Sequence, residues 1–274
     1  QGKNAFCYFT PSMQVQARLR LDLGNDLRQA VQEKQFEVHY QPIVDLATGK
    51  AVRAEALLRW PHPARGMVPP DEFISTAEEI GLIGMIGDEV FRQALDLATW
   101  WRERQAGAKI GINVSPRQFI SGSCRAWLQT LRQASLPADL LSVEIVERLL
   151  LDERSVVTET LQEFRSAGMT VSIDDFGTGY SALSYLQKFD LYELKRDRSF
   201  INALASSHSD QTIVEAIIAM AHKLGLKVVA EGVETQAQCD LLRVAGCDYA
   251  QGYLFARPMP REKFIAWLGQ AATP

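Results

Sequence analysis

Eight short segments with the pattern of β-strands, most of them followed by a helical pattern, limit the fold of this chain more than any other feature. The predicted strands cover residues 36–42, 51–57, 109–113, 140–146, 169–174, 191–197, 227–231 and 248–251. Helical spacing of apolar residues is found over residues 14–34, 71–80, 84–104, 123–134, 152–167, 181–187, 209–224, 234–244 and 260–270. Such alternation over 274 residues is typical of parallel strands that close into a barrel wrapped in helices.

The connection between the first two strands is different. It consists of little more than Ala47-Thr-Gly-Lys50, which is too short for a helical crossover, so these two strands are predicted to be antiparallel. We therefore expect an α/β fold, a TIM-like (β/α)8 barrel with one antiparallel strand near the start. A doubly wound open sheet is the alternative, but Gly81, Gly84 and Gly87 have the wrong spacing for its glycine fingerprint.

The composition excludes several classes of protein. Apolar residues make up 47% of the chain, which supplies a large core and excludes disorder. The formal net charge of -4 provides no basic surface for duplex DNA or RNA. No apolar run is long enough to span a membrane. We expect a cytoplasmic domain and, because the sequence begins at Gln1, a trimmed fragment whose parent protein could be membrane-anchored.

Cysteine and histidine show no metal-ligand spacing. No CxxC or HExxH pattern occurs among Cys7, Cys124, Cys239, Cys247, His39, His62, His208 and His222. We therefore expect reduced, structural thiols and no zinc site.

Acidic and amide residues gather where the predicted strands end. Together with Lys195, these strand ends carry Glu55, Asn113, Glu144, Asp174, Asp175, Glu231 and Gln251. In a barrel of this kind the active site lies at this end, because the loops after the strands converge there. Five carboxylates against one lysine would repel one another unless cations bind among them. Oxygen ligands favour Mg²⁺ or Mn²⁺ over zinc.

The adjacent pair Asp174-Asp175 points to the chemistry. Neighbouring side chains of a strand face opposite ways, so the chain must turn for both aspartates to reach one site. A shared aspartate can bridge two ions, the arrangement used for in-line attack on phosphate esters. A reaction on a phosphodiester is the leading prediction, with sugar-acid or keto-acid chemistry as the alternative. For Arg59, substrate phosphate binding and a surface ion pair both stay open.

Eight motifs of the chain resemble, in order and spacing, those of the EAL domain family. They are Gln41-Pro-Ile, Glu55-Ala-Leu-Leu-Arg-Trp60, Asn113-Val-Ser, Glu144-Ile-Val-Glu147, Asp174-Asp-Phe-Gly-Thr-Gly-Tyr-Ser181, Lys195-Arg-Asp197, Glu231-Gly-Val-Glu234 and Gln251-Gly-Tyr-Leu-Phe. The resemblance covers residues 20–270. It implies a TIM-like barrel with one antiparallel strand that hydrolyses cyclic di-GMP to linear pGpG with Mg²⁺ or Mn²⁺, in bacterial signalling such as biofilm control.

The resemblance also implies roles for individual residues. One metal ion would be held by Glu55, Asn113, Glu144 and Asp174, and a second by Asp174 and Asp175 with help from Glu231. The catalytic group would comprise Glu55, Asp175, Lys195 and Glu231. Contacts to substrate would come from Gln41, Arg59, Asn113, Asp197, Glu234 and Gln251. Glu147 would anchor the loop after Asp175, and Lys195 would orient the attacking water or offset phosphoryl charge.

One motif departs from the family pattern. The stretch Lys-Ile/Leu-Asp of the family is Lys195-Arg196-Asp197 in this chain. Alternation along the strand directs Arg196 toward the helix layer, so we expect it to reach solvent or an acidic partner.

The remaining expectations concern partners and a competing function. Residues 1–19 resemble the tail of a GGDEF domain and are predicted to be a linker remnant, and residues 271–274 a C-terminal tail. We expect an upstream sensory or GGDEF domain and a homodimer through barrel helices. The alternative function is a catalytically silent receptor for cyclic di-GMP. Intact ligand positions and an intact loop over residues 175–181 favour catalysis.

Overall fold

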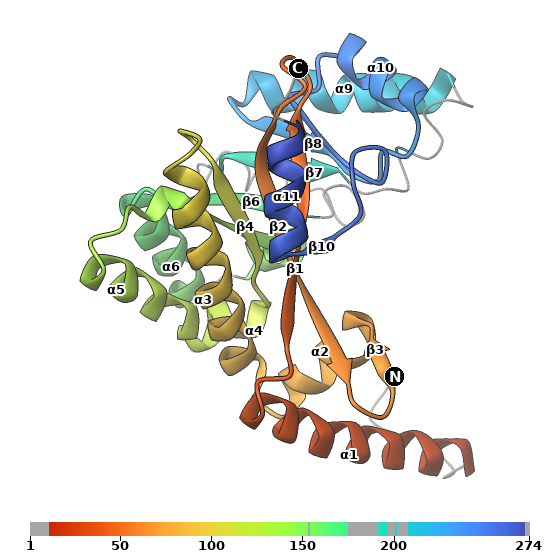
Figure 1. Cartoon of the computed structure of the whole chain (residues 1–274), viewed down its shortest axis with the longest axis vertical. Helices are drawn as coiled ribbons and strands as arrows, with labels where there is room; N and C mark the ends of the chain where they lie inside the picture. Colours follow the sequence, from red (N-terminus) through yellow and green to blue (C-terminus); the bar gives the residue numbers. More distant parts are fainter. Residues whose placement is uncertain (1–10, 153, 175–190, 197–200, 202–207, 272–274) are drawn as a thin grey trace.

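The structure, a computed structural model, describes residues 11–152, 154–174, 191–196, 201 and 208–271 (Figure 1). Its strands are β1 (Glu37–Asp45), β2 (Ala51–His62), β3 (Gly66–Val68), β4 (Lys109–Asn113), β5 (Leu141–Val146), β6 (Thr170–Asp174), β7 (Glu193–Arg196), β8 (Lys227–Ala230), β9 (Tyr249–Gln251) and β10 (Met259–Pro260). Its α-helices are α1 (Pro11–Gln32), α2 (Pro70–Glu79), α3 (Ile83–Arg102), α4 (Pro116–Ser121), α5 (Ala126–Gln133), α6 (Ser155–Ser166), α9 (His208–Lys223), α10 (Gln236–Val244) and α11 (Arg261–Ala271). Short 3₁₀ helices are η1 (Ser123–Arg125), η2 (Ala138–Leu140) and η3 (Glu147–Leu151).

Eight of the strands close into a barrel. Strands β2, β4, β5, β6, β7, β8 and β9 are parallel neighbours in that order. Strand β1 closes the ring by pairing antiparallel with both β2 and β9. The predicted fold, a TIM-like barrel with one antiparallel strand near the start, is therefore confirmed, and the open sheet is not formed.

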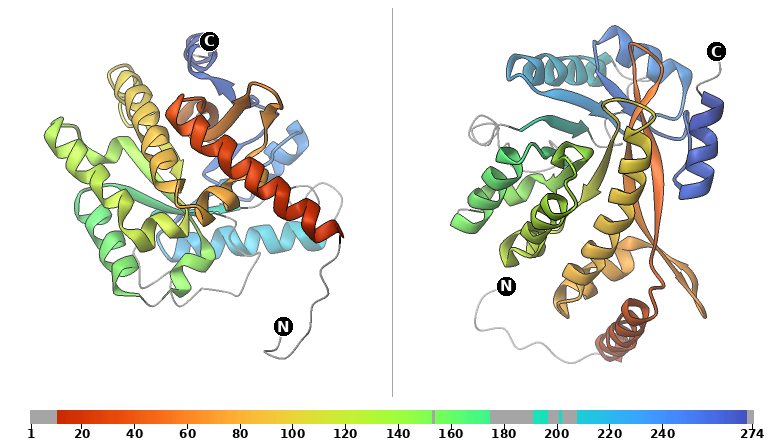
Figure 2. Two further views of the ribbon diagram at one scale, coloured as in Figure 1. Left: turned by 90° about the horizontal axis from the view of Figure 1, so that it is seen from below. Right: turned by 60° about the vertical axis from the view of Figure 1, so that its left-hand side comes forward.

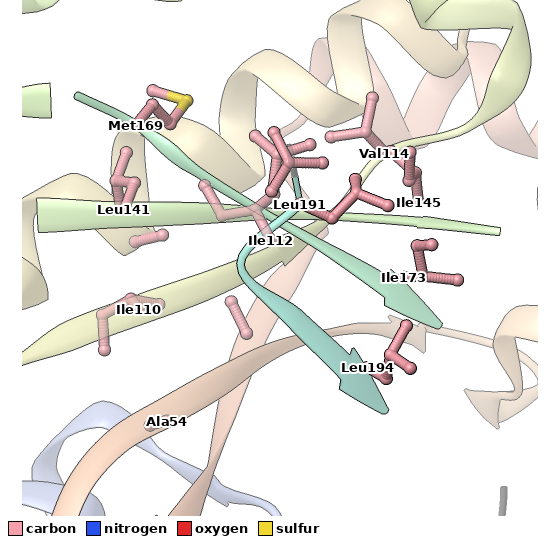
Figure 3. Packing of buried hydrophobic residues seen from close by; sticks show 14 of the residues in the cluster. Ala54, Ile110, Ile112, Val114, Leu141, Ile145, Met169, Ile173, Leu191 and Leu194 are labelled. Carbon is pink, nitrogen blue, oxygen red and sulfur yellow. The ribbon is translucent and has the colours of Figure 1, made fainter. Parts of the chain in front are cut away.

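The alternation along the strands sets an apolar outer face against a polar interior. Ile110, Ile112, Ile145 and Ile173 are fully buried in the main core, which lies between the strands and the surrounding helices (Figure 3). The side chains of the opposite phase are also buried but polar, among them Arg53, Glu55, Ser142, Glu144, Ser172, Glu193 and Lys195. Because buried charges need partners, the barrel interior must hold them in pairs or networks.

A smaller core lies beside the barrel under α1. Trp60 at the end of β2 contacts Phe36 and Phe73 with ring centroids 5.7 and 5.3 Å apart. Leu23 and Leu27 of α1 are buried in the same cluster. Figures 1 and 2 show α1 lying across this part of the molecule, next to α2 and β3.

Two predictions of local structure were incomplete. Strands β3 and β10 were missed, because three and two residues are too short to show an alternating pattern. The helix predicted over residues 123–134 consists of η1 followed by α5, and the preceding α4 was missed. Ser115 begins α4 with a capping box, and Gly122 interrupts it in the left-handed region with φ 71°. The predicted helix over 181–187 lies outside the described residues.

The described cysteines are buried free thiols, as expected for structural residues. Burial raises the pKa of Cys124 and of Cys247 to about 12, so neither is a thiolate at neutral pH. Within the described part of the chain, no helix has both the length and the apolar character needed to cross a lipid bilayer.

Candidate active site

Polar side chains from seven neighbouring strands meet at the C-terminal ends of the parallel strands. They come from inward-facing positions or from the last residue of a strand, which is where the alternation places them. We call this group the carboxylate rim: Glu55 (β2), Asn113 (β4), Glu144 (β5), Asp174 (β6), Lys195 (β7), Glu231 (directly after β8) and Gln251 (β9). These are seven of the residues that the sequence predicted for the site.

The ammonium of Lys195 lies at the centre of the rim. Its Nζ is 2.6 Å from Glu231 Oε1, 2.7 Å from Glu144 Oε2 and 3.0 Å from Glu55 Oε2. Asp174 Oδ1 is 4.0 Å away. Burial lowers the pKa of Lys195, but the surrounding carboxylates outweigh this and raise it well above its ordinary value. Lys195 is therefore a fixed positive charge.

Glu55 is held on both carboxylate oxygens. Asn113 Nδ2 donates to Oε1 at 2.7 Å, and Gln251 Nε2 donates to Oε2 at 2.7 Å. Burial raises the pKa of Glu55, but the charge of Lys195 and these two hydrogen bonds lower it below its ordinary value overall. Glu55 is therefore ionised and oriented at neutral pH.

Glu144 lies across the barrel interior next to a glycine. A Cβ atom at position 111 would lie 2.0 Å from Glu144 Oε1, so the carboxylate fits only because Gly111 has no side chain. Burial raises the pKa of Glu144 well above its ordinary value, although Lys195 opposes the effect. Burial likewise raises the pKa of Glu231 to about 8. The rim thus holds more carboxylates than its one ammonium can keep ionised.

A cavity of about 270 Å³ opens onto the rim. Its lining comprises Gln41, Glu55, Leu57, Glu231, Gly232, Glu234, Gln251, Gly252 and Tyr253. Gln41 is buried at its base, whereas Glu234 and Tyr253 are exposed at its edge. A larger cavity of about 580 Å³ lies between α5 and α6, but none of the rim residues lines it. The cavity of about 270 Å³ is therefore the candidate active-site cavity, because rim residues line it.

Two further residues near the rim were not foreseen as functional. Gly111 makes room for Glu144, and the signal available was an isolated glycine inside a predicted strand. Tyr253 presents an exposed ring at the cavity edge, with the Arg257 guanidinium 4.1 Å from the ring centroid. Its signal was an aromatic residue two positions after Gln251.

Arg59 lies near the rim on the other side of Glu55. It is half-buried, and its Nη1 donates to the backbone carbonyl of Leu58 at 2.8 Å. Together with Asn113 and Glu144 it lines a neighbouring, mainly apolar cavity of about 300 Å³. Arg59 therefore shares this cavity with two rim residues, and its phosphate contact stays a prediction.

The structure describes only some of the remaining predicted site residues. Asp175 and Asp197 lie outside the described residues, as does the loop over 175–181, and the side chain of Arg196 is also not described. Glu147 is buried at the start of η3, directly after β5. Its predicted contact to the loop after Asp175 therefore stays a prediction.

The donor chemistry of the rim fits a hard divalent ion. Among the described residues, no three Asp, Glu, His or Cys side chains are arranged to hold a metal ion as they stand; the Lys195 ammonium lies between the carboxylates instead. The donors are nevertheless carboxylate and amide oxygens, which Mg²⁺ and Mn²⁺ prefer. Gln251 Oε1 adds a buried oxygen without a hydrogen-bond partner in the described part of the chain.

A family model and several curated relatives match most of the chain. The EAL domain family matches residues 24–258. The bifunctional diguanylate cyclase/cyclic di-GMP phosphodiesterase MucR of Pseudomonas aeruginosa is 41% identical over 97% of this chain and 39% of its own length. The cyclic di-GMP phosphodiesterase NbdA of the same species is 42% identical over 100% of this chain and 36% of its own length. The chain spans about a third to two-fifths of the length of the curated relatives it matches.

Solved structures share the fold. The PaMucR phosphodiesterase in complex with c-di-GMP has a TM-score of 0.81 at 41% identity, covering 89% of this chain and 99% of that chain. The EAL enzyme Bd1971, in its cAMP- and cyclic-di-GMP-bound form, has a TM-score of 0.86 at 33% identity, covering 92% of this chain and 70% of that chain.

Proposed function

The chain belongs to the EAL domain family, and on that premise we propose that it hydrolyses cyclic di-GMP to linear pGpG with two divalent ions, Mg²⁺ or Mn²⁺. One observation carries the proposal: the acidic residues of the family motifs converge on Lys195 at one end of a closed barrel. The activities named for MucR and NbdA, and the cyclic di-GMP complexes among similar structures, support the substrate.

The proposed metal ligands are those of the rim. Glu55, Asn113, Glu144 and Asp174 would hold one ion, with Asp174, Asp175 and Glu231 contributing to the second. Bound divalent ions polarise a phosphodiester and lower the pKa of water, which is what in-line hydrolysis requires. The oriented, ionised Glu55 supports this assignment, because its oxygens are fixed before any ion arrives.

The other side chains bind and position the substrate. Lys195 keeps its positive charge and offsets the repulsion between the rim and an anionic dinucleotide. Arg59 would contact a substrate phosphate with its planar guanidinium. Gln41, Gln251 and Glu234, with Asp197 from beyond the described residues, would line the substrate path.

The test is direct. The purified chain is incubated with cyclic di-GMP and Mn²⁺ or Mg²⁺, and pGpG is followed by chromatography. Glu55→Ala should reduce turnover by more than about 100-fold. Mutation of a residue that only supports a metal ligand already lowers metal affinity or activity about 10–100-fold, and Glu55 is a proposed ligand itself. Glu103→Ala, at an exposed residue directly after α3, is the matched control and should leave the rate unchanged. Binding of cyclic di-GMP without any pGpG would favour the silent receptor instead.

The context of the chain is part of the same proposal. We propose a cytoplasmic homodimer that works beneath an upstream GGDEF or sensory domain, which the bifunctional name of MucR supports. A monomeric mass in light scattering at working concentration would contradict the dimer.

A further inference from the structure

We propose that Gln41 is a positioning residue that holds Glu55 in place through Gln251. The chain of hydrogen bonds from the Ala256 carbonyl through Gln41 and Gln251 to Glu55 is called the amide relay below. The catalytic meaning of the amide relay rests on the proposed function, because it depends on Glu55 as a metal ligand.

The amide relay ends at a carboxylate that needs donors on both oxygens. An ionised carboxylate only accepts hydrogen bonds. Asn113 serves Glu55 Oε1, and Gln251 with Lys195 serves Oε2. Gln251 must therefore present its NH₂ group to Glu55 and not its carbonyl oxygen.

Gln41 also fixes the orientation of the Gln251 amide, from the side away from Glu55. Its Nε2 donates a second hydrogen bond, to Gln41 Oε1 at 2.9 Å, so both of its hydrogens are used. Its Oε1 is buried with no partner among the described residues. If the Gln251 amide were reversed, its carbonyl oxygen would face the carboxylate of Glu55, and the two oxygens would repel each other. The Gln41 acceptor therefore reinforces the orientation that Glu55 requires.

Gln41 is itself fixed by the backbone. Its Nε2 donates to the carbonyl of Ala256 at 3.0 Å, which leaves Oε1 as the atom facing Gln251. With 7% of its surface exposed, Gln41 has both polar ends engaged with protein. The Gln41 amide is therefore fixed at both ends, with its oxygen held toward Gln251.

Backbone hydrogen bonds hold the segment that supplies the Ala256 carbonyl. Ala256 N–H donates to the Gly252 carbonyl at 3.2 Å, and Leu254 N–H donates to the Val233 carbonyl at 3.0 Å. A Cβ atom at Gly252 would lie 2.1 Å from the Val233 carbonyl oxygen, so the two backbones are in close contact. The same segment carries Tyr253 at the cavity edge. The amide relay therefore connects the cavity edge to the predicted metal ligand.

A double-mutant cycle tests the amide relay. Gln41→Met, Gln251→Met and the double variant are compared by Mn²⁺ titration without dinucleotide and by hydrolysis. We expect Gln41→Met to weaken Mn²⁺ affinity about tenfold, in the range for residues behind a metal ligand. If Gln41 acts only through Gln251, the double variant will bind Mn²⁺ no more weakly than Gln251→Met. Additive losses would overturn the proposal, as would a higher KM for Gln41→Met with unchanged Mn²⁺ affinity.

A matched control and a second readout separate positioning from folding. The half-buried Gln105 also uses both ends of its amide, accepting from Trp101 Nε1 and donating to the Ala51 carbonyl at the opposite end of the barrel. Gln105→Met should leave Mn²⁺ affinity unchanged. The side-chain amide signal of Gln251 in NMR, assigned from its loss in Gln251→Met, should shift in Gln41→Met. An unshifted signal would contradict the amide relay, even if the wild type hydrolysed nothing and the proposed function had failed.

Discussion

Among the described side chains, each end of this barrel buries one cation, and the two cations are balanced differently. At the N-terminal ends of the parallel strands, Arg53 forms a buried ion pair with the single carboxylate of Glu193. Tyr192 Oη accepts from Arg53 Nη2 at 3.1 Å, and the ring centroid of Tyr249 is 4.3 Å from its guanidinium carbon. At the other end, Lys195 has four carboxylates within 4.0 Å.

The difference separates a structural site from a functional one. At the Arg53 end, one positive charge is paired with one negative charge and has polar and aromatic neighbours. No further ion is needed there to balance the buried charge. The Lys195 end holds four carboxylates against one ammonium, and burial, together with the neighbouring carboxylates, raises the pKa of Glu144 and of Glu231. Unbalanced burial of this kind marks a place where a ligand completes the charge.

The largest effect is expected from removing the cation of the unbalanced end. Lys195→Met should abolish hydrolysis and lower the free energy of unfolding by about 3–5 kcal/mol, because it leaves buried carboxylates unpaired. The loss should be greater at about pH 8 than at about pH 6, where Glu144 and Glu231 keep more of their protons. Millimolar Mn²⁺ should restore much of the stability in urea unfolding. Exposed Lys223→Met is the control.

The balanced end gives the contrasting experiment. Arg53→Met leaves Glu193 buried without its partner and should cost about 3 kcal/mol of unfolding free energy. Here Mn²⁺ should add no more stability than it adds to the wild type. A selective rescue of Arg53→Met by Mn²⁺ would break the distinction between the two ends.

A smaller effect, confined to the unbalanced end, is expected at Gly111. The new methyl group of Gly111→Ala would displace the Glu144 carboxylate, because the Cβ would lie 2.0 Å from Oε1. We expect Mn²⁺ affinity to fall about 10–100-fold while the protein still folds. Gly84→Ala, whose Cβ would meet nothing closer than 3.6 Å, is the matched control. Unchanged Mn²⁺ affinity in Gly111→Ala would remove Glu144 from the metal site.

The smallest effect concerns Asp248, at the start of β9 and therefore at the balanced end. Partial burial raises its pKa, but hydrogen bonds from Lys227, His222 and the Val228 N–H lower it below the ordinary value of 3.8 overall. A lowered pKa stabilises the fold above the unfolded-state value, and this contribution is lost as pH falls through the native value. Asp248→Asn should therefore cost roughly 1 kcal/mol at about pH 6. The difference from wild type should shrink below about pH 4, and a constant difference would contradict it.

Much of the fold was predictable because its signals are local. The strand Lys109–Asn113 was predicted to the residue, since period-two alternation is read within five positions. The antiparallel start followed from a connection too short for a helix. Strands β3 and β10 were not predictable, because their pairing with β2 and β1 depends on neighbours and not on their own pattern. Helix α4 was missed because its six residues are too few to show a helical period.

The candidate site was predictable as a list of residues but not as a network. Strand ends placed Glu55, Glu144 and Lys195 at one rim, because parallel strands share one direction. The sequence alone determined the barrel, its polar interior and the residues at its functional end. Only the tertiary structure decided that Gln41 supports Gln251, 210 positions away, and that Arg53 pairs with Glu193, 140 positions away. Such contacts depend on closure of the barrel, which brings distant strands to hydrogen-bond distance and which no local pattern encodes.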